Sequence, residues 1–324
     1  AAQTKMGPAI FQPAMIKAAI ARDSQLLILC WNIRFVHLIP AIIVARVLGK
    51  PVLLWGHGFS KRDSKLRTIL RNIPAFLASG CIVYNKHAAH SLIEYGLKKS
   101  RVHVAPNALN QKQIAEYTNV WLSDSNKLET FRKENSLGNS PVVLFASRLV
   151  SDNRVELLLE AFCILLQKHT RAKLAIIGDG PAMPALRDKI RTLGVEKQVL
   201  LVGEVYGEHE IAPWFLSSTC FAYPTNIGLS LLHAFGYGLP AVTSDNISHH
   251  NPEIACLQDG WNGLLYKDGS PADFAEKIDK VISDKAWRLS AKVNAIDTVV
   301  KGEHSFDNMV KGFRNAILEL LPSE

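Results

Sequence analysis

The stretch Tyr223–Thr243, with the sequence YPTNIGLSLLHAFGYGLPAVT, decides the fold of the chain. The apolar run that leads into it stops at Pro224, which is typical of a strand that ends there. From Leu229 to Phe235 apolar residues recur at helical spacing, and two glycines and Pro240 then end the helix before a new apolar run. The stretch therefore predicts a strand, a tight corner, a helix and a second strand.

The start of this helix is a candidate phosphate site. The first turn of a helix leaves backbone N–H groups unpaired, and these groups carry partial positive charge. The corner Asn226-Ile227-Gly228 opens such a turn, which makes it a seat for phosphate. A buried strand–helix–strand unit with a tight glycine turn would give the same pattern, so both interpretations stay open on the pattern alone.

Short strands alternate with helices along the rest of the chain, which favours an α/β fold with parallel, doubly wound sheets. The polar segment 110–140 interrupts this alternation, and we interpret it as the inter-domain connection. The first part is expected to hold strands at 26–30, 51–55, 81–84 and 102–105, and the second part at 142–146, 172–177, 199–202, 219–223, 241–243 and 263–266.

Composition is that of a globular protein of 324 residues, long enough for two domains. No run reaches the eighteen or so apolar residues of a membrane span, and residues 1–20 lack the pattern of a signal peptide. The five cysteines are widely spaced and lie mostly inside apolar runs, so they resemble reduced cytosolic thiols more than a disulfide or zinc framework. We expect a cytoplasmic protein without a metal or other cofactor.

The net charge of +8 is concentrated in the first part of the chain. Residues 1–130 hold 17 basic and 6 acidic residues, whereas the remainder holds 20 and 23. One face is therefore expected to meet an anionic partner, and no nucleic-acid recognition module is visible. Five basic residues crowd the run 60–71, which is either a solvated helix face or a patch for an anionic membrane or a phosphate-bearing acceptor: Lys61, Arg62, Lys65, Arg67 and Arg71.

The opening stretch resembles the donor-site motif of the retaining glycosyltransferases of family 4, which have the two-domain GT-B fold. Ile227-Gly228-Leu229 matches the corner of that motif and Ala234–Pro240 matches its tail. Two glutamates that bracket the family motif are replaced here by Thr225 and His233.

The resemblance covers nearly all of the chain and implies two Rossmann-like, doubly wound parallel-sheet domains. We expect an acceptor-side domain at 1–125, a nucleotide-sugar-binding domain at 126–304 and a terminal helix at 305–324 that crosses back to the first domain. Members of the family begin with a strand and a glycine-rich turn, which Ala1–Asp23 lacks. The first domain is therefore expected to be incomplete, with about four strands and with apolar surface exposed along one sheet edge.

The resemblance also assigns roles to particular residues. It implies a catalytic role for Thr225 and His233, at the family positions that touch the sugar and the ribose, and for His57, which follows a first-domain strand. Arg148 would hold the donor diphosphate, because its guanidinium presents a fork of donors to two phosphate oxygens. The donor-binding residues implied are Arg148, Asn153, Arg154, Gly203, Glu204, Val205, Ile227, Gly228, Leu229, Ser230, Asn251 and Glu253.

Together these features predict a retaining glycosyltransferase that moves a sugar from a nucleotide-diphosphate sugar to a glycan or lipid-linked acceptor at the inner membrane surface. Because Asn153, Thr225 and His233 replace three charged family residues, a weakly catalytic or non-catalytic nucleotide-sugar-binding or scaffold protein is the main alternative. A nucleotide-sugar epimerase on the same fold is the other.

Overall fold

The computed structural model describes residues 4–58 and 65–321, and the chain divides into two compact α/β units. Unit 1 comprises Ala1–Asn107 and Asp307–Glu324, and unit 2 comprises Ala108–Phe306. The division falls earlier than the boundary at residue 125 that the polar segment indicated. The reason is that α5 (Gln111–Leu122) packs against three helices of unit 2 and buries Ile114 in the core of that unit.

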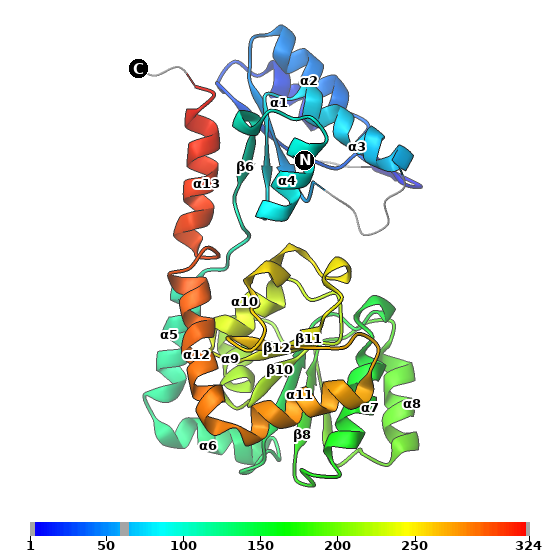
Figure 1. The fold of residues 1–324 in the computed structure, drawn as a ribbon, viewed down its shortest axis with the longest axis vertical. Coiled ribbons are helices and arrows are strands. Elements are labelled where there is room, and N and C mark those ends of the chain that lie inside the picture. Colours follow the sequence, from blue (N-terminus) through cyan, green and yellow to red (C-terminus); the bar gives the residue numbers. More distant parts are fainter. Residues whose placement is uncertain (1–3, 59–64, 322–324) are drawn as a thin grey trace. The chain divides into compact units, whose positions relative to one another are not determined.

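Unit 2 is built on a six-stranded parallel sheet in the order β12-β11-β10-β7-β8-β9. Its strands are β7 Val142–Ala146, β8 Lys173–Ile177, β9 Val199–Gly203, β10 Cys220–Ala222, β11 Ala241–Ser244 and β12 Gly263–Tyr266. Its principal helices, which surround the sheet in Figure 1, are α6 Ser125–Glu134, α7 Val155–Leu165, α8 Met183–Leu193, α9 Glu208–Leu216, α10 Leu229–Gly236, α11 Pro271–Ser283 and α12 Lys285–Val300. All five positions of β7 are buried, as expected of a central strand covered on both faces.

The strand order reverses between β7 and β10. From β7 the chain adds β8 and β9 on one side, and then returns to place β10, β11 and β12 on the other side. In an open parallel sheet such a switch point leaves a crevice outside the carboxyl ends of the two strands, and ligands bind there. The topology of unit 2 thus marks one place for a binding site.

Two glycines allow the loops at this edge to approach each other. Gly178 follows β8 with φ of +129°, and a Cβ on it would lie 2.0 Å from the carbonyl oxygen of Ser147. Gly180 has φ of +156°, and its Cβ would lie 2.3 Å from the carbonyl oxygen of Leu149. Only glycine fits either position, so this pair fixes the course of the loop that follows β7.

Unit 1 contains a four-stranded parallel sheet in the order β3-β4-β5-β6, and the sequence predicted all four strands. They are β3 Leu27–Cys30, β4 Val52–Gly56, β5 Gly80–Val83 and β6 Val102–Val104, with helices α2 Leu38–Val47, α3 Lys65–Leu77 and α4 Lys86–Glu94. The hairpin of β1 (Thr4–Met6) and β2 (Ala9–Phe11) and helix α1 (Ala14–Ile20) were not predicted, because three-residue strands show no usable periodicity.

The C-terminal helix α13 (Phe306–Leu318) belongs to unit 1 from residue 307 onward. Ala316 is fully buried in a small cluster with Leu53 of β4, and the ring of Phe313 meets Trp55 edge-on at 5.4 Å between centroids. Strand β3 forms one edge of this sheet, and its residue Ile28 is 38% exposed.

Within residues 4–58 and 65–321 no helix combines the length and the apolar character needed to cross a membrane.

We expect Gly178→Ala to destabilise the protein by roughly 3 kcal/mol or more, because the new methyl group would collide with a backbone carbonyl in addition to the strained φ. Gly194→Ala is the matched control, since Gly194 has φ of +68° but open space around it, and should cost only about 1 kcal/mol. Equilibrium urea unfolding measures both values. Equal losses would show that the close approach of the two loops does not matter.

Candidate functional site

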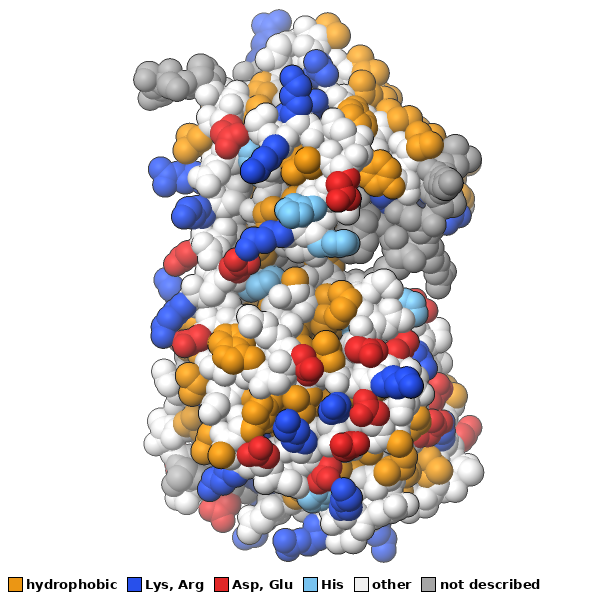
Figure 2. Space-filling view, in the orientation of Figure 1, with side chains coloured by type: hydrophobic (Ala, Val, Ile, Leu, Met, Phe, Trp, Pro, Cys, Tyr) orange, Lys and Arg blue, Asp and Glu red, His pale blue; other side chains and the backbone are white. Residues whose placement is uncertain are grey.

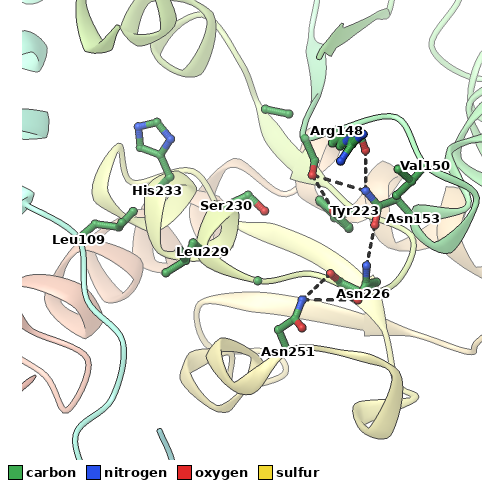
Figure 3. A pocket seen from close by; sticks show the side chains of 13 residues that line it. Leu109, Arg148, Val150, Asn153, Tyr223, Asn226, Leu229, Ser230, His233 and Asn251 are labelled. Carbon is green, nitrogen blue, oxygen red and sulfur yellow. Dashed lines mark hydrogen bonds between the residues drawn. The ribbon is translucent and has the colours of Figure 1, made fainter. Parts of the chain in front are cut away.

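A cavity of about 570 Å³ opens in unit 2 at the switch point between β7 and β10 (Figure 3). Most of its residues come from the loop after β7, from the corner between β10 and α10, and from the first turns of α10. None of its side chains is acidic. The lining residues are Leu109, Ala146, Ser147, Arg148, Val150, Asn153, Tyr223, Asn226, Gly228, Leu229, Ser230, His233 and Asn251.

A chain of hydrogen bonds joins the two loops across the switch point. The phenol of Tyr223 donates to Ser147 Oγ at 3.0 Å. The buried side chain of Asn153 donates from Nδ2 to the carbonyl oxygen of Arg148 at 2.7 Å and accepts at Oδ1 from Asn226 Nδ2 at 2.8 Å. Burial raises the pKa of Tyr223, so its phenol remains a donor. Asn153 therefore acts as a latch between the loops.

The start of α10 is shaped for an anion. Gly228 is the N-cap, no side chain caps it, and Gly228, Leu229 and Ser230 line the cavity. The N–H groups that open a helix have no partner within it, so those of this turn are available to a ligand in the cavity. Asn226 stands before it with φ of +64°, a conformation that asparagine tolerates better than most residues. Asn251 donates from Nδ2 to the Asn226 carbonyl oxygen at 3.0 Å and would lie 3.0 Å from a Cβ at position 228. The corner is thus held rigidly, with backbone donors open to a ligand.

The two neighbouring arginines have different surroundings. The Arg148 side chain lines the cavity and is exposed. Arg154 does not line it: its φ is +50°, and its Nη1 forms an ion pair with Asp268 Oδ1 at 3.1 Å. Arg148 and the N-terminus of α10 therefore supply the positive potential of the cavity, and Arg154 is engaged elsewhere.

His233 lies one turn along α10 from Leu229, on the face that lines the cavity. Its Nε2 is 2.7 Å from Glu208 Oε1, and the phenol of Tyr237 donates to the same oxygen. Its ring also packs against Phe215, with 4.7 Å between centroids. Burial alone would raise the pKa of the Glu208 carboxyl, but the bonds and charge of His233 and the bond from Tyr237 hold it below its ordinary value. Glu208 is therefore ionised near neutral pH.

Several residues that the sequence assigned to the site lie away from the cavity lining. The side chain of Thr225 is 3% exposed, and its hydroxyl has no hydrogen-bond partner among the described residues. Ile227 is fully buried in the core, and its N–H donates to His250 Nδ1 at 3.2 Å. Glu253 is also buried, and none of Gly203, Glu204 and Val205, which end or follow β9, lines the cavity. The catalytic role of Thr225 and the donor-binding roles of the others stay predictions.

The predicted residues of unit 1 form no part of this cavity. His57 is exposed just beyond the carboxyl end of β4, with its ring 4.9 Å from that of Tyr84. Of the basic run, Arg67 is exposed and Arg71 half-buried on α3. Lys61 and Arg62 lie outside the described residues, as does the side chain of Lys65.

Sequence reasoning missed about half of the cavity. Asn226 was named only as part of the corner before the helix, and no role was given to Leu109, Ala146, Ser147, Val150 and Tyr223. Most of them end or follow β7 and β10, two strands that pair in the sheet although residues 147–219 separate them in the sequence. Glu208 and Tyr237 were missed as well. These cavity residues could have been found only by knowing that β10 lies beside β7 in the sheet. A single sequence does not show which strands are neighbours.

Two α/β units with parallel sheets, and a cavity at the switch point of the second, define the GT-B class of fold. The solved structure of Anabaena Alr3699/HepE in complex with UDP superposes on 94% of this chain and 81% of that chain, with a TM-score of 0.74 and 18% identity. The family model described as "Glycosyl transferases group 1" matches residues 126–298, which is more than half of the chain. The chain belongs to this family.

Curated relatives match parts of the chain. An exopolysaccharide phosphotransferase of Streptomyces coelicolor is 32% identical over 190 residues, which are 53% of this chain and 19% of the relative. An uncharacterized glycosyltransferase of Methanocaldococcus jannaschii is 24% identical over 258 residues, which are 78% of this chain and 63% of the relative. The chain thus spans less than two thirds of the length of these two relatives.

We expect Asn153→Ala to destabilise the protein by about 1–3 kcal/mol, because it removes the two hydrogen bonds by which the buried Asn153 side chain joins the loops. The midpoint of urea unfolding should fall while the slope stays constant. Asp152→Ala, at the exposed neighbouring position, is the control and should change the free energy of unfolding by less than about 0.5 kcal/mol. Similar values for both variants would contradict the latch.

Proposed function

We propose that the protein is a retaining glycosyltransferase that moves a sugar from a nucleoside-diphosphate sugar to an acceptor. The observation that carries this proposal is the cavity at the switch point of unit 2, where Arg148 and the uncapped N-terminus of α10 converge and no acidic side chain intrudes. Such an arrangement suits a diphosphate. The Anabaena neighbour, which was solved with UDP, supports a nucleoside diphosphate as the donor's leaving group.

The proposed chemistry is electrostatic. As the bond between the sugar and the diphosphate breaks, negative charge grows on the phosphate oxygen and positive charge grows on the sugar. Arg148 and the N–H groups after Gly228 stabilise the leaving diphosphate without help from a metal ion. His57, at the carboxyl end of a strand in unit 1, orients the sugar or the acceptor, and Thr225 supports the corner from within the core.

We further propose that the acceptor is a glycan or lipid-linked glycan, presented at the inner surface of a membrane to a cytoplasmic, peripherally bound protein. Helices α2 and α3 are in contact and carry exposed apolar stripes, visible in Figure 2 as hydrophobic side chains over this part of unit 1. The stripes consist of Ile39, Ile43 and Val47 on α2 and Ile69, Leu70, Ile73 and Phe76 on α3. Beside them, Arg67 adds positive charge that attracts anionic lipid.

A second candidate is a protein that binds a nucleotide sugar without transferring it. It is favoured by the burial of Thr225 and by the use of Asn153 as a latch, because neither side chain brings charge to the cavity. The two candidates share the donor site and differ in turnover, so one set of measurements separates them.

We expect the wild-type protein to bind UDP and to turn over at least one member of a panel of nucleotide sugars. Arg148→Ala should weaken UDP binding by about 1.5–3 kcal/mol, since a phosphate loses its forked donor. Arg154→Ala is the matched control. Arg154 is the next arginine along the chain, but it pairs with Asp268, so its loss should change the affinity for UDP little. Calorimetry gives the affinities, and product NMR gives turnover and anomeric configuration.

These measurements have three informative outcomes. Binding without turnover across the panel would favour the binding protein, and a product of inverted configuration would contradict retention. If Arg148→Ala binds UDP as tightly as the wild type does, the diphosphate does not occupy this cavity.

The membrane proposal predicts that Ile69→Ser combined with Ile73→Ser reduces co-flotation with vesicles of anionic phosphatidylglycerol several-fold, because apolar contact with the bilayer is lost. The double control Leu289→Ser with Val293→Ser removes two apolar side chains that are comparably exposed on α12 of unit 2, and should float like the wild type. Equal flotation of both variants would refute the apolar stripes of α2 and α3, with Arg67 beside them, as the docking surface. Strong binding to neutral phosphatidylcholine vesicles without binding to anionic vesicles would refute it as well.

A further inference from the structure

The carboxylate of Glu208 does not line the cavity, but it contacts His233, which does. It comes from the first residue of α9, whereas His233 comes from the middle of α10. Both side chains are mostly buried, with 16% and 19% of their surface exposed, and the contact between them is 2.7 Å. A buried, charge-assisted contact of this length fixes both groups strongly.

The contact determines which nitrogen of His233 carries the proton. An ionised carboxylate only accepts hydrogen bonds, so the ring atom facing it, Nε2, must be the N–H. A 180° flip of the ring would place a carbon where Nε2 now meets Glu208 Oε1, so the contact with Glu208 itself holds the ring in this orientation, and Phe215 packs against its face. The charge of His233 that lowers the pKa of Glu208 belongs to the doubly protonated ring, in which Nδ1 also carries a hydrogen. In the neutral ring, Nδ1 is left with a lone pair.

Nδ1 has no hydrogen-bond partner among the described residues, although His233 lines the cavity. Phosphate groups offer acceptors and would repel a lone pair, whereas a hydroxyl group can donate to it. Figure 3 places His233 apart from Arg148, which is the residue suited to phosphate. The two ends of the cavity therefore present different chemistry, a cationic fork at one and a fixed acceptor at the other.

We propose that Glu208 is a positioning residue for His233: its carboxylate keeps the proton on Nε2, so that Nδ1 accepts a hydrogen bond from a hydroxyl of the bound nucleotide. This inference rests on the proposed function, because it takes a nucleoside diphosphate as the ligand. It adds a residue that does not line the cavity and a requirement for a hydroxyl group, which the ribose supplies.

The test compares Glu208→Gln with Glu210→Gln. Both changes remove one negative charge from the first turn of α9, but Glu210 is exposed and outside the cluster. By calorimetry, Glu208→Gln should weaken UDP binding about tenfold and Glu210→Gln less than about twofold. In a His233→Ala background, Glu208→Gln should have no further effect, because Glu208 acts through the imidazole. An equal loss in that background would show that Glu208 acts independently of His233, and would overturn the proposal.

Two further readouts make the assignment specific. At a pH at which the imidazole is neutral, NMR of the ¹⁵N-labelled imidazoles should show His233 protonated at Nε2 alone in the wild type, and mixed between the two nitrogens in Glu208→Gln. The affinity of wild type and Glu208→Gln should also be measured for 2′-deoxy-UDP and 3′-deoxy-UDP. One of these analogues lacks the hydroxyl that Nδ1 binds, and with that analogue the loss of affinity caused by Glu208→Gln should disappear. A loss of the same size with both analogues would overturn the hydroxyl contact, and an Nδ1–H tautomer in the wild type would overturn the positioning role.

Failure of this inference is distinguishable from failure of the proposed function. If UDP binds and Arg148→Ala weakens it, but Glu208→Gln does not, then only the role of Glu208 is wrong. If the wild type binds no UDP, the donor site itself is wrong, even where the NMR spectrum shows the expected tautomer.

Discussion

The pairing of β10 with β7 is the constraint on which the site depends. It brings together two loops that are far apart in the sequence and leaves a crevice outside the carboxyl ends of both strands. Hydrogen bonds from Tyr223 to Ser147 and from Asn226 to Asn153 then join the two loops. Without this pairing the N-terminus of α10 would still attract an anion, but Arg148 would have no fixed relation to it.

These loops are held both by the close approach of their backbones and by side-chain hydrogen bonds. Gly178 and Gly180 let the turn after β8 press against the loop that carries Arg148, and no side chain could replace that contact. Asn153 ties the same loop to the corner before α10. The loop that carries Arg148 is therefore held from two sides through its backbone, which leaves the guanidinium of Arg148 available.

Much of the fold follows from the sequence, because strands that are buried on both faces appear as short apolar runs between turn residues. This is why all ten strands of the two parallel sheets were expected close to where they lie, whereas the three-residue strands β1 and β2 were not. The site was predictable where local chemistry sufficed, as for Arg148 and Gly228. It was not predictable where a partner from another element decides the role: Arg154 is engaged by Asp268, and His233 by Glu208.

The contact between Glu208 and His233 also means that positions 208 and 233 are not independent. A glutamate at 233, as in the motif that this stretch resembles, would set two carboxylates against each other in a mostly buried place, where one of them would have to take up a proton. The histidine left beside a neutral residue at 208 would lose its orientation. Each single change is thus less favourable at this contact than the pair found here, so the residue at either position limits which residues the other position tolerates.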